Sequence, residues 1–283
     1  MRFGTGLPLT ANPDASAVRD IVQALDGGGI DFLTVGGHLL SLPPDSQPGR
    51  PAMTYVGPFY DAFVLYAYLA AVTQRIEFYT AILILPELPT ALVAKQAAEL
   101  SHFSGGRFQL GVGISWSEAE YAALNQNIHT RGRRLEEQIT VLRKMWTEPF
   151  VTFEGRWHHL NSIGLNRLPS RPIPIWIGSG TDDKVLRRVA RLADGWMPLG
   201  DPTEPMVRLR QFLTEAGRDP ATFSLTGRVT AGADGPDAWA AEAKRLRSAG
   251  VTDLIIGAPP DLSPSQGVAR VIEAKNVLAS ALG

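Results

Sequence analysis

Two glycines, Gly111 and Gly113, mark the stretch of the sequence with the clearest capacity for chemistry. They lie in the apolar segment 108–114, which predicts a strand, so both glycines face the same side of it. Glycine weakens a strand interior, and two on one face indicate that a flat or bulky group lies against bare backbone. We therefore predict a shelf for a cofactor. The plainer alternative is an ordinary strand of an α/β protein.

A second glycine-rich turn, Gly178-Ser179-Gly180-Thr181, joins a predicted strand to the start of a predicted helix. Unpaired backbone N–H groups and the helix dipole attract anions to such a terminus. Asp182 and Asp183 follow directly and would repel a phosphate if they faced it, whereas Lys184 and Arg187 would attract one. The spacing alone leaves open whether this turn binds an anion or whether the aspartates only favour the helix start.

Few ionisable side chains follow the predicted strands, namely His38, Glu87, Glu118 and Asp201. A lone histidine such as His38 is either a proton-transfer group or a loop residue bonded to backbone. All five lysines fall in predicted helices, which argues against a Schiff-base enzyme. We find no metal-ligand spacing and no paired strand-end carboxylates, so no metal site and no glycosidase chemistry are expected. Bare backbone with few acid–base groups fits a bound cofactor that supplies the chemistry itself.

Strand-like and helix-like stretches alternate from end to end. The predicted strands are 2–9, 31–35, 76–85, 108–114, 173–177, 195–199, 223–229 and 252–256. The predicted helices are 16–25, 61–73, 90–103, 131–146, 182–193, 205–216, 236–249 and 264–282. Eight such units with short connections predict one (β/α)8 TIM barrel domain over residues 1–283, with a small β-hairpin inserted at 150–160. An open doubly wound sheet is the alternative, but no GxGxxG follows the first strand.

The composition excludes several classes of protein. A net charge of −1 and a pI near 6.5 give no broad basic surface for nucleic acid or anionic lipid. The absence of cysteine excludes disulfides, thiolate metal ligands and cysteine nucleophiles. The first residues lack the features of a signal peptide, and the longest apolar run, 62–72, is too short to cross a bilayer. We expect a cytoplasmic protein.

The predicted helix 61–73 is apolar on every side, which is unusual for an outer helix of a barrel. Either the proline-rich loop before it covers one face, or a second subunit does. A twofold homodimer is the simplest expectation.

Several ordered motifs together resemble a known family. They are RFQLGVGISW, EYAALN and RGRRLEEQITVLRKMW, then FEGRWHHL, and finally PIPIWIGSG followed by ARLADGWMP. The chain resembles the luciferase-like monooxygenase superfamily, and within it the branch of dehydrogenases and reductases that use the deazaflavin coenzyme F420. The resemblance runs over essentially the whole chain and is most specific between Arg107 and Pro198.

The resemblance implies a luciferase-like (β/α)8 barrel, usually homodimeric, with the isoalloxazine-like ring across the barrel mouth. Relatives commonly carry an acid before the histidine of the second strand, where this chain has Gly37 before His38. The resemblance further implies cofactor contacts from a bulge at Thr80-Ala81, from Gly111-Val112-Gly113 and from Leu199-Gly200. It also implies phosphate binding by the turn Gly178-Ser179-Gly180-Thr181.

We accordingly expect an oxidoreductase that binds coenzyme F420 and passes hydride between its C5 and a small organic substrate. His38 is the first candidate to protonate or polarise that substrate, and Glu118 is the second. An FMN-dependent monooxygenase on the same scaffold is one alternative, and a flavin- or deazaflavin-binding protein without chemistry is another. The loop 39–58 and the side chains of Trp116 and Trp157 are candidate walls of the substrate pocket.

Overall fold

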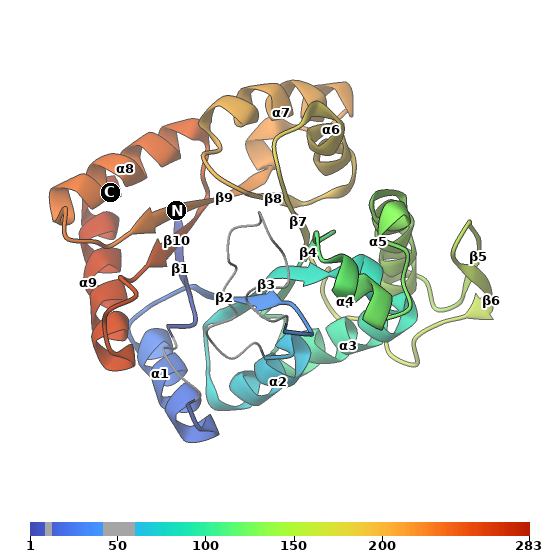
Figure 1. Cartoon of the computed structure of the whole chain (residues 1–283), viewed down its shortest axis with the longest axis horizontal. Coiled ribbons are helices and arrows are strands. Elements are labelled where there is room, and N and C mark those ends of the chain that lie inside the picture. The colour runs from blue at the N-terminus through green and yellow to red at the C-terminus, as the bar shows by residue number, and fades with distance from the viewer. Residues whose placement is uncertain (9–12, 42–59) are drawn as a thin grey trace.

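A computed structural model describes residues 1–8, 13–41 and 60–283. Eight parallel strands in this part of the chain close into a barrel with the order β1-β10-β9-β8-β7-β4-β3-β2 (Figure 1). They are β1 (Arg2–Gly6), β2 (Phe32–Gly37), β3 (Glu77–Ile84), β4 (Phe108–Gly113), β7 (Ile175–Ser179), β8 (Gly195–Pro198), β9 (Ser224–Thr230) and β10 (Asp253–Gly257). The predicted TIM barrel is confirmed. Each strand alternates with helix, as parallel pairing requires.

The helices surround the barrel (Figure 1). The outer ring is α1 (Ala15–Gly27), α2 (Ala62–Val72), α3 (Thr90–Phe103), α5 (Arg131–Thr147), α6 (Asp183–Leu192), α7 (Thr203–Glu215), α8 (Pro236–Ala249) and α9 (Pro264–Leu282). One stripe of α5, formed by Leu135, Ile139, Leu142 and Trp146, is buried against the core. A short helix that the sequence did not predict, α4 (Glu118–Ala123), lies between β4 and α5. Single-turn helices occur at η1 (Leu85–Glu87), η2 (Ile128–Thr130) and η3 (Pro220–Thr222).

The predicted β-hairpin consists of β5 (Val151–Glu154) and β6 (His159–Ile163), which pair with each other outside the barrel (Figure 1). Glu137 on α5 anchors it. Its carboxylate accepts hydrogen bonds from the backbone N–H of Arg156 and Trp157 and contacts His158 Nδ1 at 2.7 Å. Trp157 therefore belongs to the hairpin and is not among the residues that line the cavity described below.

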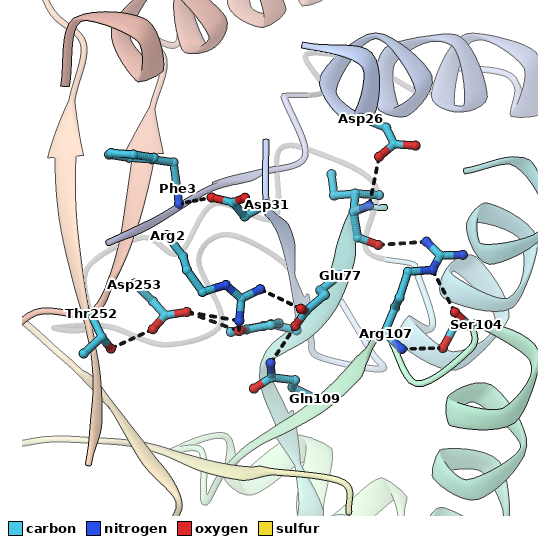
Figure 2. Close-up of polar contacts among 12 residues, drawn as sticks. Arg2, Phe3, Asp26, Asp31, Glu77, Ser104, Arg107, Gln109, Thr252 and Asp253 are labelled. Carbon is cyan, nitrogen blue, oxygen red and sulfur yellow. Dashed lines mark hydrogen bonds and ion pairs between the residues drawn. The ribbon is translucent and has the colours of Figure 1, made fainter. Parts of the chain in front are cut away.

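Charged and aromatic side chains close the amino-terminal end of the barrel. Figure 2 shows Arg2 extending between Glu77 and Asp253. Its guanidinium lies 2.9 Å from Glu77 Oε1 and donates a 2.7 Å hydrogen bond to the hydroxyl of Tyr79. That hydroxyl donates to Asp253 Oδ1 at 3.2 Å, and Gln109 donates to Glu77 at 2.6 Å. This floor joins β1, β3, β4 and β10, and in barrels such contacts serve stability.

Arg107, which precedes β4, fixes the helices next to β3. Its guanidinium donates to the carbonyl oxygens of Ala70, Ile76 and Ser104 at 2.7–2.9 Å (Figure 2 shows part of this network). These carbonyls end or follow helices, where backbone acceptors lack partners within the helix. Arg107 also donates to the carbonyl and hydroxyl oxygens of Thr73, so it satisfies five acceptors at once.

A bulge in β3 shapes the upper half of the barrel. Tyr79 pairs with Gln109, but the next paired residue, Leu83, lies opposite Val112, so β3 carries one extra residue. The peptide bond between Ala81 and Ile82 is cis. A bulge of this kind re-aims side chains next to a site. Below it, the interior is filled by a buried cluster of Phe32, Tyr79, Trp176, Met197 and Ile255.

The apolar helix α2 is buried on one face only within this chain. Its other face exposes Val64, Ala67, Tyr68 and Ala71, which are spaced as one helical stripe. Leu92 of α3 is also exposed. The proline-rich loop that was the alternative cover lies, for residues 42–59, outside the described part of the chain. Within the described residues, no helix is long and apolar enough to cross a membrane.

Candidate active site

A cavity of about 860 Å³ opens at the carboxyl ends of the barrel strands, which is where barrel enzymes hold their sites. Its walls are mostly backbone and apolar side chains, among them Ile82, Ile114, Trp116 and Met197. Nine predicted site residues line it: Gly37, His38, Ala81, Gly113, Gly178, Ser179, Gly180, Leu199 and Gly200. Five residues named from the sequence do not: Thr80, Gly111, Val112, Thr181 and Glu118.

Thr80 and Gly111 bind each other instead of facing the cavity. The Thr80 hydroxyl donates to the Gly111 carbonyl at 2.7 Å and accepts from the Gly111 N–H at 2.8 Å. A Cβ placed on Gly111 would lie 1.9 Å from the Thr80 carbonyl oxygen. The bare backbone of Gly111 is therefore required by the bulge of β3. Val112 points the other way, into the core between the barrel and its helices.

Ile82 fills the space beside two further glycines. A Cβ on Gly113 would lie 2.7 Å from Ile82 Cδ1, and one on Gly178 would lie 2.4 Å from Ile82 Cγ2. The group that lies against these glycines is thus the bulged strand β3. Ile82, Gly113 and Gly178 then present a continuous apolar shelf to the cavity.

His38 is held by a buried carboxylate that the sequence did not single out. Its Nδ1 lies 2.8 Å from Oε2 of Glu120, and the side chain of Glu120 is fully buried. The other oxygen, Oε1, accepts hydrogen bonds from the backbone N–H of Leu39 and Leu40 at 2.7 and 3.2 Å. Glu118, the acid predicted here, is exposed in the first turn of α4. The carboxylate that reaches His38 therefore comes from the same first turn of α4, two residues further along the chain.

The hydrogen bonds keep Glu120 ionised. Burial alone would raise the pKa of its carboxyl, but the bonds from His38, Leu39 and Leu40 outweigh burial and hold the pKa below its ordinary value. An ionised Glu120 accepts a hydrogen bond, so Nδ1 of His38 carries the proton. This fixes the ring orientation and, in the neutral ring, places the lone pair on Nε2. Trp116 lies beside the histidine, with the two ring centroids 6.5 Å apart.

A second buried acid, Glu87, lies behind this pair. Glu87 is only 2% exposed, and neither of its carboxyl oxygens has a hydrogen-bond partner among the described residues. Burial and the charge of Glu120 raise the pKa of Glu87 to about 8. Glu87 is therefore neutral near pH 7. It does not line the cavity.

The turn at residues 178–181 leaves room for a ligand. A Cβ on Gly180 would meet no atom within 4 Å. Ser179 Oγ accepts a 3.0 Å hydrogen bond from Trp196 Nε1, which fixes the turn to β8. Asp183 forms an ion pair with Arg208, whereas Arg187 is paired with Glu215 on α7. Neither Asp183 nor Arg187 is then an isolated charge at the turn.

Among the described residues, three arginines line the cavity, and two of them are paired with acids. Arg188 contacts Glu136 at 2.8 Å, and Arg245 contacts Asp201 at 2.7 Å. The third, Arg228 on β9, has neither a hydrogen bond nor an ion pair with any described residue. The sequence carried a signal for it, because a charged residue in the middle of a barrel strand has to face either the packed helices or the barrel interior.

Groups for other chemistries are not assembled in the described part of the chain. It contains no cluster of three or more His, Asp or Glu side chains suited to hold a metal ion. The five lysines lie in α3, α5, α6, α8 and α9, as predicted. The site is an apolar, backbone-lined cavity with a histidine–carboxylate pair at its rim.

The fold and this cavity define the class as a (β/α)8 barrel protein with an apolar cavity at the carboxyl ends of its strands. Residues 1–275 match the family described as luciferase-like monooxygenase, and the chain belongs to this family. Its members are oxidoreductases and monooxygenases. The predicted family is confirmed.

Individual relatives differ in what they are named for. The chain is 38% identical over 302 residues to the uncharacterized protein Rv0940c of Mycobacterium tuberculosis (strain ATCC 25618 / H37Rv), with 99% of each chain covered. It is 29% identical over 236 residues to the pyrimidine monooxygenase RutA of Allorhizobium ampelinum, covering 79% of this chain and 62% of RutA. A solved F420-dependent secondary alcohol dehydrogenase, in complex with an F420-acetone adduct, matches with a TM-score of 0.79 over 98% of both chains at 16% identity. This last likeness shows a shared fold.

Proposed function

We propose that the protein is an oxidoreductase that binds coenzyme F420 in this cavity and transfers hydride between C5 of the cofactor and a small organic substrate. The observation that carries the proposal is the apolar, backbone-lined cavity of about 860 Å³ with the His38–Glu120 pair at its rim. The F420-dependent dehydrogenase of the same fold supports the choice of cofactor.

The residues present fit a flat ring that carries a phosphate tail. The shelf of Ile82, Gly113 and Gly178 is smooth and apolar, as the face of a ring system requires. Backbone N–H groups of Ser179 and Gly180, next to the open space at Gly180, would hold the phosphate with the help of the α6 dipole. The cofactor, when bound, supplies the hydride donor or acceptor.

His38 is the proposed catalytic residue. A carbonyl that receives hydride must also gain a proton on its oxygen, and an alcohol that loses hydride must give that proton up. His38 moves this proton at the substrate oxygen. Glu120 positions the ring and stabilises its protonated form, as a buried carboxylate does for a histidine base. The apolar walls exclude water from the reacting atoms.

An FMN-dependent monooxygenase is the second candidate function, favoured by the identity with the monooxygenase RutA. The same shelf would take a flavin ring. A protein that binds either cofactor without chemistry is the third, and sustained turnover of any substrate would exclude it.

Fluorescence titration tests the proposal directly. Trp116 lines the cavity, so a bound ring should quench its emission. We expect saturable quenching by F420 and at least tenfold weaker binding of FMN. Trp116→Phe should lose most of the quenching, whereas Trp157→Phe, which changes a hairpin residue outside the cavity, should keep it. Preference for FMN would favour the monooxygenase, and no quenching by either would overturn both cofactor assignments.

We further propose a twofold homodimer through α2 and α3. The stripe of Val64, Ala67, Tyr68 and Ala71 is exposed on α2, and Leu92 is exposed on the neighbouring helix α3. Contiguous apolar surface on two helices is typical of interfaces in homo-oligomers.

A further inference from the structure

Arg228 points into the barrel mouth. Alternate residues of a strand face the same side, and Thr226 and Thr230 on either side of Arg228 also line the cavity. Leu225 and Val229, with the opposite parity, are buried in the core between the strands and the helices. The position in β9 therefore fixes the direction of the side chain, although the guanidinium itself is solvent-exposed.

Among the residues that the structure describes, Arg228 has no counterion. Its neighbour across the ladder on β10 is Ile255, and the next inward residue of that strand is Gly257. A Cβ on Gly257 would lie 3.8 Å from Arg228 Nη1, so the guanidinium lies over bare backbone. The acids nearest in the cavity lining, Asp201 and Glu242, are both engaged by Arg245.

The strand order places Arg228 across the mouth from the apolar shelf. Counting along the closed barrel, β9 lies four strands from β3 in either direction. The proposed phosphate-binding turn lies at the end of β7. In the barrel, β7 is separated from β9 by β8 and is the neighbour of β4, which carries Gly113 of the shelf. The cation therefore lies on the wall that faces the shelf, where a substrate would sit beside a ring bound to it.

We propose that Arg228 binds the anionic group of the substrate, so that the cavity selects small organic molecules that carry a carboxylate or a phosphate. Arginine offers a planar fork of N–H donors that matches both anions in a bidentate manner. Among the described residues of the cavity lining, the other two arginines are paired with acids, so Arg228 would set the orientation of the bound molecule. The inference deepens the proposed function, on which it rests for the assignment of the cavity to a substrate.

Binding of matched probes tests the inference without catalysis. Benzoate and phenyl phosphate carry the anion, and benzamide is the neutral control of the same shape. Ligand-observed NMR at constant ionic strength gives the affinities for wild type, Arg228→Met, Arg228→Lys and Arg133→Met. Arg133 is exposed on α5 outside the cavity lining, so its variant reports the loss of one positive charge alone.

We expect wild type to bind at least one anion about tenfold more tightly than benzamide. Arg228→Met should abolish this preference, Arg228→Lys should keep part of it, and Arg133→Met should keep all of it. Which anion binds more tightly assigns the class as carboxylate or phosphate. No preference in wild type, or an equal preference in Arg228→Met, would overturn the inference.

Repeating the titration with saturating F420 or FMN separates the two proposals. Retained binding of the anion assigns Arg228 to the substrate, whereas competitive loss assigns it to the cofactor and overturns the inference. If neither cofactor binds but the anion preference still depends on Arg228, the proposed function fails and the anion site stands.

Discussion

Nδ1 of His38 lies 2.8 Å from Oε2 of Glu120, although the two residues are separated by 82 positions in the sequence. The same carboxylate accepts the backbone N–H groups of Leu39 and Leu40. One buried acid thus fixes both the side chain of the histidine and the backbone that follows β2. This relationship makes α4 part of the site, although none of its residues lines the cavity.

Replacing Glu120 should therefore cost stability. Glu120→Gln removes an ionised acceptor from buried donors, and we expect a loss of about 1–3 kcal/mol in the free energy of unfolding at pH 7. The folded pKa lies below the unfolded value, so the contribution is present above about pH 4.5 and disappears as the pH falls through the folded pKa. Urea unfolding at several pH values measures this. Glu118→Gln is the exposed control, and an equal loss in both variants would contradict the buried role.

His38→Ala should reduce turnover by roughly a hundredfold or more while cofactor affinity stays within a few-fold. The reason is that the histidine moves a proton and, in the proposed mechanism, is not needed to hold the ring. Steady-state kinetics and fluorescence titration of the same preparation give the two values. Unchanged turnover would exclude His38 as the catalytic residue.

Glu87→Gln should stabilise the protein in a pH-dependent way. Because the folded pKa of about 8 exceeds the unfolded value of 4.5, wild type loses stability as the pH rises between these values. The glutamine variant lacks this slope. Its advantage over wild type should grow by on the order of 3–5 kcal/mol from about pH 5 to about pH 8. Any fixed cost of burying the amide cancels in this difference, and a difference that does not change with pH would refute the raised pKa.

Gly111→Ala should be strongly destabilising. The new Cβ would lie 1.9 Å from the backbone oxygen of Thr80, which cannot move without breaking the bulge of β3. We expect a loss of roughly 3 kcal/mol or more. Gly180→Ala is the matched control, since its Cβ meets no atom within 4 Å, and its stability should change by less than about 0.5 kcal/mol. Thermal unfolding compares the two variants, and similar losses would contradict the packing argument.

Val64→Lys should convert a dimer into a monomer. Val64 is 71% exposed within the chain and belongs to the proposed interface on α2. Val207→Lys on α7 is the control, because Val207 is a similarly exposed valine (65%) on another side of the barrel. Light scattering after size-exclusion chromatography gives the mass of each. A wild type that is already monomeric would exclude the proposed assembly.

The barrel was predictable because each strand and helix carries its own pattern of apolar residues and its own stop signals. Helices α3, α8 and α9 begin and end where the sequence predicts. Helix α4 was not predictable, because six residues are too few to show a periodic apolar stripe. Because α4 was not predicted, Glu118 was named as a catalytic candidate and Glu120 was not. With Ser117 as N-cap, Glu118 falls in the exposed first turn, whereas Glu120 turns inward.

The paired glycines of β4 illustrate a different limit. Their shared face predicts close contact with some bulky group, and close contact is found. The contacting group at Gly111 is the carbonyl of Thr80 and at Gly113 the side chain of Ile82. A pattern within one strand cannot distinguish a ligand from a neighbouring strand, because both demand the same bare backbone. The register shift in β3 shows that the contacting group is a neighbouring strand and not a ligand. Register is a property of the folded sheet, so one strand's sequence does not reveal it.

The floor of the barrel has a consequence for how the chain folds during synthesis. Arg2 is translated long before its second acid partner, Asp253, and before β10, one of the two strands that pair with β1. Until β10 leaves the ribosome, β1 has one unpaired edge, and its arginine can pair with Glu77 but not with Asp253. Closure therefore waits until the long segment between β1 and β10 has been synthesised, and such long-range pairing is intrinsically slow. Chaperones that shield exposed strand edges should associate with the nascent chain throughout this interval.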